Sequence, residues 1–127
     1  MPNPKVQTVM TVDESGAELV NFAQQTAEVL VKQNLTRSQI RTIFTEVRQI
    51  EAAWGKPEAA RRLSMLKPKL AYQAARSGSV DHLREVLSDA IDEVIKAPAA
   101  KRDQTFARFV ELFEAILAYH RAQGGRN

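Results

Sequence analysis

The chain contains no cysteine. A disulfide framework, a thiolate metal site and a cysteine nucleophile are therefore excluded, and the composition suits a reducing compartment. No apolar run approaches the roughly 18 residues that a membrane span needs. The N-terminus has two prolines and no long apolar core, which argues against a secretory signal. These absences predict a soluble protein of the cytoplasm that does not contact a membrane.

Motifs for catalysis are also missing. The two histidines are His82, expected in the first turn of a helix, and His120, expected on an apolar helical stripe. There is no H-E-x-x-H motif, no E-x-x-H pair of a di-iron bundle and no glycine loop that cradles phosphate. Acidic pairs at helical spacing, such as Asp89 with Asp92, lack an opposing set of ligands. The sequence predicts no enzymatic activity and no bound cofactor or metal.

Helical spacing of apolar residues runs through most of the chain, and no segment alternates as a strand does. The 127 residues, with 44% hydrophobic and 26% charged side chains, are typical of one globular domain. We expect an all-α, elongated bundle of about five helices in a single domain over residues 13–123. A loose, flexible arm (1–12) is expected before it, because Pro2 and Pro4 oppose a helix, and a tail (124–127) after it.

Three sequence features define the expected helices more closely. Thr36 and Gln39 have the spacing of a capping box, which predicts the start of the second helix. Pro68 is expected to interrupt or kink the third helix, with a new turn from Lys69. In the fifth helix a second apolar strip, made of Leu112, Ala115 and Tyr119, indicates either a central position in the bundle or contact with a partner.

Positive charge is concentrated in residues 32–76. This segment holds ten of the eighteen lysines and arginines but three of the fifteen acids, a net charge of +7, whereas the rest of the chain carries −4. Such a local excess is expected of a surface that meets a polyanion. The alternative is a solvated helical surface without a ligand. We expect folding to gather these cations into one continuous positive ridge.

In the second helix, Arg37, Arg41 and Arg48 fall within about 40° of one another on a helical projection, next to Phe44. This column of guanidinium groups either meets phosphates or pairs with acids such as Glu51.

The third helix carries a similar stripe, in which Tyr72 lies between Lys69 and Arg76. Cations can hold phosphates while an aromatic ring stacks on a base. The alternative is a half-buried Tyr72 with only its hydroxyl at the surface.

Three segments of the chain, in order, resemble the small subunit of the type III-A CRISPR effector, the Csm complex. They read LTRSQIRTIFTEVRQI, MLKPKLAYQAAR and FVELFEAILAYHRAQGG, and they span about Leu35 to Gly125. The resemblance implies a small helical bundle without nuclease activity, several copies of which stack along the inner side of a ribonucleoprotein filament. It also implies contact with the backbone of crRNA and target RNA, without reading of sequence.

The resemblance implies that cleavage belongs to other Csm subunits, the backbone subunit for target RNA and the large subunit for DNA. Further copies of the same chain are implied as neighbours. Together, the resemblance and the charge pattern predict the residues that bind the RNA backbone: Arg37, Arg41, Arg48, Lys67, Lys69, Tyr72, Arg76 and Arg121.

Two other functions stay open at this stage. VKQNLTRSQIRTIF has a helix, a short turn and a basic helix start, as in a helix-turn-helix DNA-binding regulator. Its apolar stripe runs the full length of the second helix, which leaves few side chains to read bases. The second apolar strip of the fifth helix, in turn, is compatible with a purely structural helical adaptor.

Overall fold

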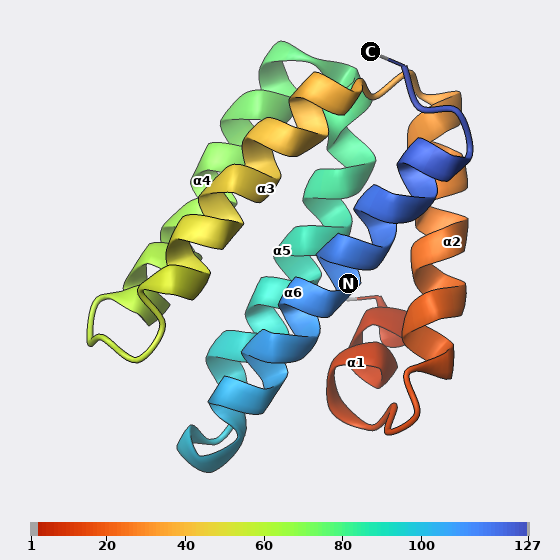
Figure 1. Cartoon of the computed structure of the whole chain (residues 1–127). Helices are drawn as coiled ribbons and strands as arrows, with labels where there is room; N and C mark the ends of the chain where they lie inside the picture. Colours follow the sequence, from red (N-terminus) through yellow and green to blue (C-terminus); the bar gives the residue numbers. More distant parts are fainter. Residues whose placement is uncertain (1–2, 127) are drawn as a thin grey trace.

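A computed structural model describes residues 3–126 and contains helices but no strand among them. The all-α class is confirmed, with six α-helices rather than about five (Figure 1). The helices are α1 (Pro4–Thr11), α2 (Ala17–Lys32), α3 (Arg37–Ala52), α4 (Ala59–Arg76), α5 (Asp81–Lys96) and α6 (Ala99–Ala122), with a 3-10 turn, η1 (Gly78–Val80). In this described part of the chain, no helix is long and apolar enough to cross a membrane.

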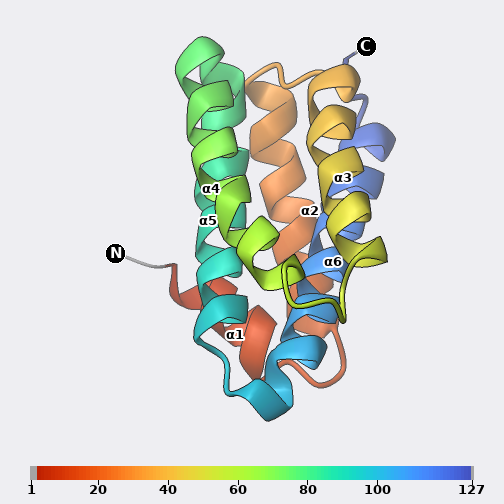
Figure 2. The same cartoon turned by 90° about the vertical axis from the view of Figure 1, so that its left-hand side faces the viewer.

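Helix α6 lies at the centre of the bundle and packs against α1, α2, α3 and α5. Helix α4 packs on α5 and α3, so that α3 and α4 form one side of the molecule, which faces the viewer in Figure 2. All six α-helices contribute to one buried apolar cluster. Its largest fully buried side chains include Met10, Leu30, Leu35, Ile40, Ile50, Leu63, Leu70, Leu83, Leu87, Ile91, Phe109 and Phe113.

The central position of α6 accounts for its second apolar strip. Leu112 is fully buried, and Ala115 and Tyr119 pack against the core. A helix that contacts neighbours on several sides must be apolar on more than one face. Of the two interpretations of this strip, the structure supports burial within the chain.

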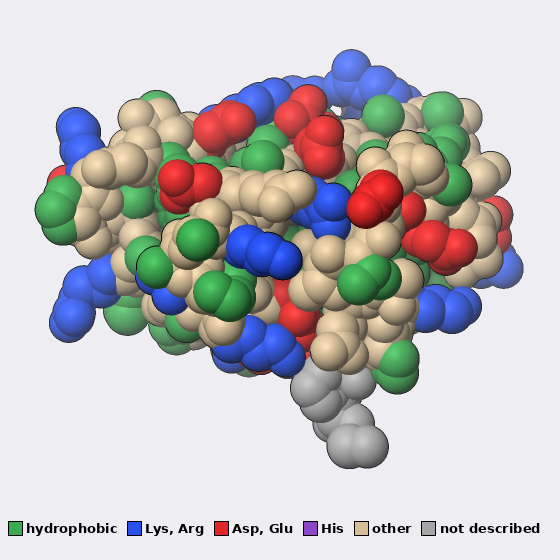
Figure 3. All heavy atoms as spheres, turned by 90° about the horizontal axis from the view of Figure 1, so that it is seen from below, with side chains coloured by type: hydrophobic (Ala, Val, Ile, Leu, Met, Phe, Trp, Pro, Cys, Tyr) green, Lys and Arg blue, Asp and Glu red, His purple; other side chains and the backbone are tan. Residues whose placement is uncertain are grey.

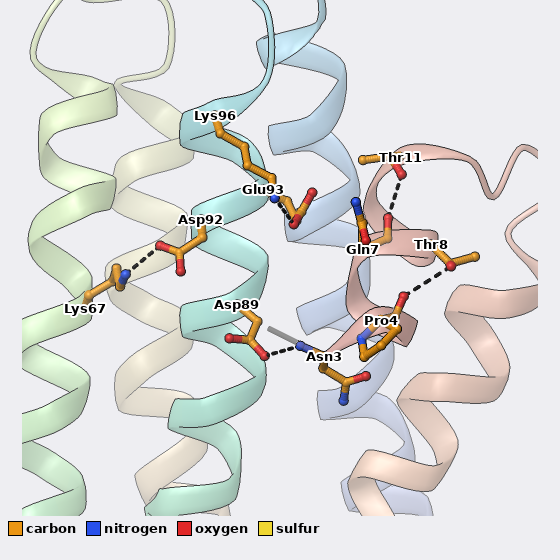
Figure 4. A network of polar contacts seen from close by, with 10 residues as sticks. All are labelled: Asn3, Pro4, Gln7, Thr8, Thr11, Lys67, Asp89, Asp92, Glu93 and Lys96. Atoms are coloured by element: carbon orange, nitrogen blue, oxygen red, sulfur yellow. Dashed lines mark hydrogen bonds and ion pairs between the residues drawn. The ribbon is translucent and has the colours of Figure 1, made fainter. Parts of the chain in front are cut away.

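Residues 4–11 form a helix, not the loose arm expected from the two prolines. Pro4 lies in the first turn of α1. Backbone N–H groups in a first turn make no hydrogen bond within the helix, so a proline there costs none. The side chain of Asn3 caps the helix, and its backbone N–H donates to Asp89 of α5 at 3.0 Å (Figure 4). Three apolar side chains anchor α1 in the core, namely Val6, Val9 and Met10. Pro2 lies outside the described residues.

Pro68 was expected to interrupt or kink its helix, and α4 runs through it without interruption. Proline removes one hydrogen bond from a helix and crowds the preceding turn. Here Pro68 is on the exposed side. Buried Leu63, Leu66 and Leu70 hold the turns before and after it against the core. Packing of this apolar face therefore outweighs the local preference of one residue.

The ends of α2 and α6 close in the same way and lie against each other. Asn34 (φ 66°) and Gly124 (φ 86°) adopt the left-handed conformation. Backbone hydrogen bonds from Leu35 N–H to the carbonyl of residue 30 and from Gly125 N–H to the carbonyl of residue 120 complete two Schellman motifs. The N–H of Arg37 then donates to the carbonyl of Arg126 at 2.6 Å. The last described residues are thereby tied to the start of α3.

Candidate nucleic-acid interface

Four of the eight residues predicted to bind RNA line one groove between α3 and α6. The groove, of about 380 Å³, is called here the arginine groove. Its cations are Arg37, Arg41 and Arg48 of α3 and Arg121 of α6. Its other lining residues are Ile40, Phe44, Glu114, Leu117, Ala118 and His120.

The sequence of α3 positions its arginines on the side of α6. The predicted capping box is present, with Thr36 Oγ1 accepting from Gln39 N–H at 3.1 Å and Gln39 Oε1 accepting from Thr36 N–H at 2.9 Å. It fixes where the helix begins. Burial of Ile40 and Ile43 then fixes the rotation of the helix about its axis. The arginine column therefore lies at the edge of the buried face, beside α6.

Arg48 is held in place by three contacts. Its guanidinium lies 2.7 Å from a carboxylate oxygen of Glu51 and 3.5 Å from one of Glu114, and 4.8 Å from the centroid of the Phe44 ring. The hydrogen bond to Glu51 raises the pKa of Arg48 above its ordinary value. The expected alternative of pairing with acids thus applies to Arg48. Among the described residues, no ion pair involves Arg41 or Arg121, both of which are exposed.

Three more of the predicted residues form an exposed stripe on α4. This α4 strip consists of Lys69, Tyr72 and Arg76. The guanidinium of Arg76 lies 5.7 Å from the centroid of the Tyr72 ring, and Tyr72 is 63% exposed. The alternative of a half-buried tyrosine is therefore wrong. Lys69 Nζ lies 2.8 Å from Glu46 of α3, so this end of the strip is partly neutralised.

The eighth residue, Lys67, lies apart from the others. It pairs with Asp92 of α5 (Figure 4), whereas Lys69 pairs with Glu46 of α3. Two steps along a helix rotate a side chain by about 200°, which separates the two lysines of the KPK sequence. The expected continuous ridge is thus divided into the arginine groove and the α4 strip, with Lys67 in neither.

Positive charge at the seam between α3 and α4 is partly compensated by one carboxylate. Glu46 of α3 pairs with both Lys69 and Arg62 of α4, at 2.8 and 3.6 Å. Arg62 also donates to the side-chain oxygen of Gln49 at 2.9 Å. Glu46 therefore places a negative charge between the arginine groove and the α4 strip and compensates part of the positive charge of the seam.

Both signs of charge are mixed at the end of the bundle near the α5–α6 turn (Figure 3). A cavity of about 650 Å³ at this end is lined by Glu14, Glu93, Lys96, Lys101 and Arg108, with residues of α1. Glu93 is a charged residue that is only 3% exposed, and its carboxylate pairs with Lys96 at 2.8 Å. This hydrogen bond raises the pKa of Lys96. A cavity of mixed charge is poorly suited to a polyanion.

Sequence reasoning named Arg121 but missed the rest of the α6 wall of the arginine groove. Glu114 and Arg121, seven residues apart, share one face of α6 with Ala118. The sequence spacing places these residues on one face of α6. It does not predict that this face lies against the arginines of α3, because that depends on how the two helices pack. The described residues contain no group of three histidine, aspartate or glutamate side chains that could hold a metal ion.

A protein-family model described as Csm2 Type III-A matches residues 13–126. The match includes α2 to α6, and therefore the arginine groove and the α4 strip, whereas α1 lies outside it. Comparison with curated proteins found no match, and comparison with solved structures found none either. The matched part is nearly the whole chain. The protein therefore belongs to the Csm2 family of type III-A CRISPR systems, the small subunit of the Csm complex.

Proposed function

We propose that this small subunit binds the sugar–phosphate backbone of crRNA and target RNA, without catalysing their cleavage. Its neighbours are the backbone and large subunits of the Csm complex and further copies of itself, and its location is the cytoplasm. The observation that supports the proposal best is the arginine groove, where Arg37, Arg41, Arg48 and Arg121 converge from two helices.

The chemistry of the groove suits phosphate. Arginine carries a permanent charge and a planar fork of donors that matches phosphate oxygens. Arg41 and Arg121 have exposed guanidinium groups on facing walls, so a strand between them can meet both. Contacts to phosphate release counterions and are largely independent of base identity. The α4 strip offers a second, weaker site, since Glu46 already compensates Lys69.

The packing of α3 argues against the helix-turn-helix alternative. In that motif the two helices form one unit, and the second enters the DNA major groove. Here α3 packs chiefly against α4 and α6, and α2 against α6 and α1. The arginines of α3 face a groove closed on one side by α6 rather than a free helical surface. The adaptor alternative loses its motivation, because the second strip of α6 is covered within the chain.

The proposal is tested by the salt dependence of RNA binding. The full chain is titrated against a short, fluorescein-labelled single-stranded RNA at several salt concentrations. Replacing Arg41 and Lys69 together (Arg41→Ala, Lys69→Ala) removes one cation from each basic surface. The slope of log affinity against log salt is expected to fall by about 1.4, since each lost contact to a single strand contributes about 0.7. The reconstituted Csm complex that carries this double variant should also bind RNA more weakly than the wild-type complex.

A matched control removes the same charge elsewhere. Lys5 lies in α1 and Lys101 lies in the first turn of α6, and both are exposed. Lys5→Ala with Lys101→Ala should therefore leave the salt slope close to that of the wild type. Equal losses in both double variants would show that only net charge matters and would refute a defined RNA surface. A clear preference for one duplex DNA sequence over a scrambled one would instead support the regulator.

A further inference from the structure

We propose that the arginine groove receives one unpaired nucleobase of the bound RNA, with the neighbouring phosphates held at its rim. This inference rests on the proposed function and specifies how that site holds its strand. It adds a preference at one nucleotide to binding that is otherwise independent of sequence.

The floor of the groove is apolar. Ile40 is fully buried, and Phe44 and Leu117 are half-buried against the core. A phosphodiester gains nothing from such a floor, whereas the face of a base does. Ala118 has a small side chain and leaves the space above the floor open. The volume of about 380 Å³ lies within the range of roughly 300–1,000 Å³ that small-molecule sites occupy.

Arg48 supplies a preformed stacking surface in this groove. Unpaired RNA bases stack on aromatic rings and on arginine guanidinium planes. A free arginine side chain loses rotamer entropy when it is fixed by a ligand. The guanidinium of Arg48 is already fixed over the Phe44 ring and by Glu51 and Glu114, at the distances given above. Stacking on Arg48 therefore carries a smaller entropic cost than stacking on an exposed arginine.

Glu114 gives the groove a chemical preference. Among residues 3–126 it is the one acid that lines the groove, and an ionised carboxylate only accepts hydrogen bonds. A base with an amino group can donate to it. Uracil has no amino group. Its single N–H lies between two carbonyl oxygens, and these oxygens repel the carboxylate of Glu114. A base can lay its face on the apolar floor only after it has left the helical stack, so the base in the groove is unpaired.

The experiment compares two short oligomers of equal length and charge: oligoadenylate and its fully abasic analogue. Affinities of the full chain for both are measured by competition with a labelled RNA. The wild type is expected to bind oligoadenylate about 5- to 100-fold more tightly, as stacking of one base allows. Ala118→Leu fills the groove without changing charge, so this ratio should fall to about twofold or less, with unchanged affinity for the abasic oligomer.

Three further variants locate the effect. Ala107→Leu adds the same side chain at an exposed position of α6 outside the groove and should leave the ratio intact. Tyr72→Leu removes the ring of the α4 strip, and loss of the ratio in this variant would place the stacking on α4. Glu114→Gln should reduce the preference for oligoadenylate over oligouridylate, because an amide both donates and accepts. Ala118 is an exposed helical residue, so the leucine variant should unfold at the same urea concentration as the wild type, which verifies its fold.

The outcomes separate this inference from the proposed function. Equal, salt-sensitive binding of both oligomers by the wild type would overturn the base site and leave backbone binding standing. A ratio that survives Ala118→Leu but disappears in Tyr72→Leu would also overturn it, since the stacking would then belong to α4. If neither oligomer binds at low salt, the proposed function itself fails.

Discussion

His120 joins three parts of the chain at one point. Its side chain is fully buried, and its Nε2 lies 2.7 Å from the carbonyl oxygen of Leu35. A carbonyl only accepts, so Nε2 carries the proton and the ring is held as this tautomer. The imidazole also packs closely on Gly125. The sequence predicted a structural histidine on an apolar stripe, and the contact with Leu35 confirms this.

The contact between Gly125 and the His120 ring leads to a prediction. A Cβ atom at position 125 would overlap the imidazole, which is enclosed and cannot move away. Gly125→Ala is therefore expected to lower the free energy of unfolding by about 1–3 kcal/mol, the usual cost of overpacking. Urea denaturation followed by circular dichroism measures this loss.

Gly78→Ala is the matched control. A Cβ at position 78 would have no neighbour within 4 Å, and the φ angle there is not positive. Its free energy of unfolding should stay within about 0.5 kcal/mol of the wild type, as for other surface substitutions. If the two variants were equally stable, the close packing of His120 on Gly125 would be disproved.

At the scale of the elements, periodicity identified most of the helices but not α1. The apolar stripes of α2, α3, α5 and α6 extend over three or more turns. The predicted Thr36–Gln39 capping box is present at the start of α3. Helix α1 has eight residues, which is too short for periodicity to outweigh two prolines. Its stability comes from burial against α5, α2 and α6, which local sequence does not reveal.

The anchoring of α1 can be tested through Met10. Met10 is 1% exposed, so Met10→Ala should leave a cavity and cost about 2–5 kcal/mol of unfolding free energy. A loose arm would show no such loss. Val12→Ala truncates an apolar side chain that is 68% exposed and should cost far less. Thermal or urea unfolding of both variants decides between an integral α1 and a flexible one.

At the scale of the whole molecule, charge along the sequence did not predict charge in space. The excess of cations in residues 32–76 is real, but four carboxylates compensate part of it. Glu46 pairs with Lys69 and Arg62, Asp92 pairs with Lys67, and Arg48 pairs with both Glu51 and Glu114. The arginine groove could not be derived from composition, because half of its wall comes from α6, far along the chain.

The division of the KPK sequence gives a prediction at this scale. Lys69 belongs to the α4 strip, whereas Lys67 faces α5. Lys69→Ala should lower the salt slope of RNA binding by about 0.7, and Lys67→Ala, of identical charge change, should leave it unaltered. Titration of both variants under one set of buffers measures the difference. A larger effect from Lys67 would mean that RNA follows the α5 side instead.

The hydrogen bond between Arg37 and Arg126 has a practical consequence for work on this protein. It places the backbone of Arg126 beside Arg37, which lines the arginine groove. A bulky label attached at Arg126 would therefore lie beside the groove and obstruct a strand entering it. A label attached near Asn3 avoids this, because Asn3 caps α1 and contacts Asp89 on α5.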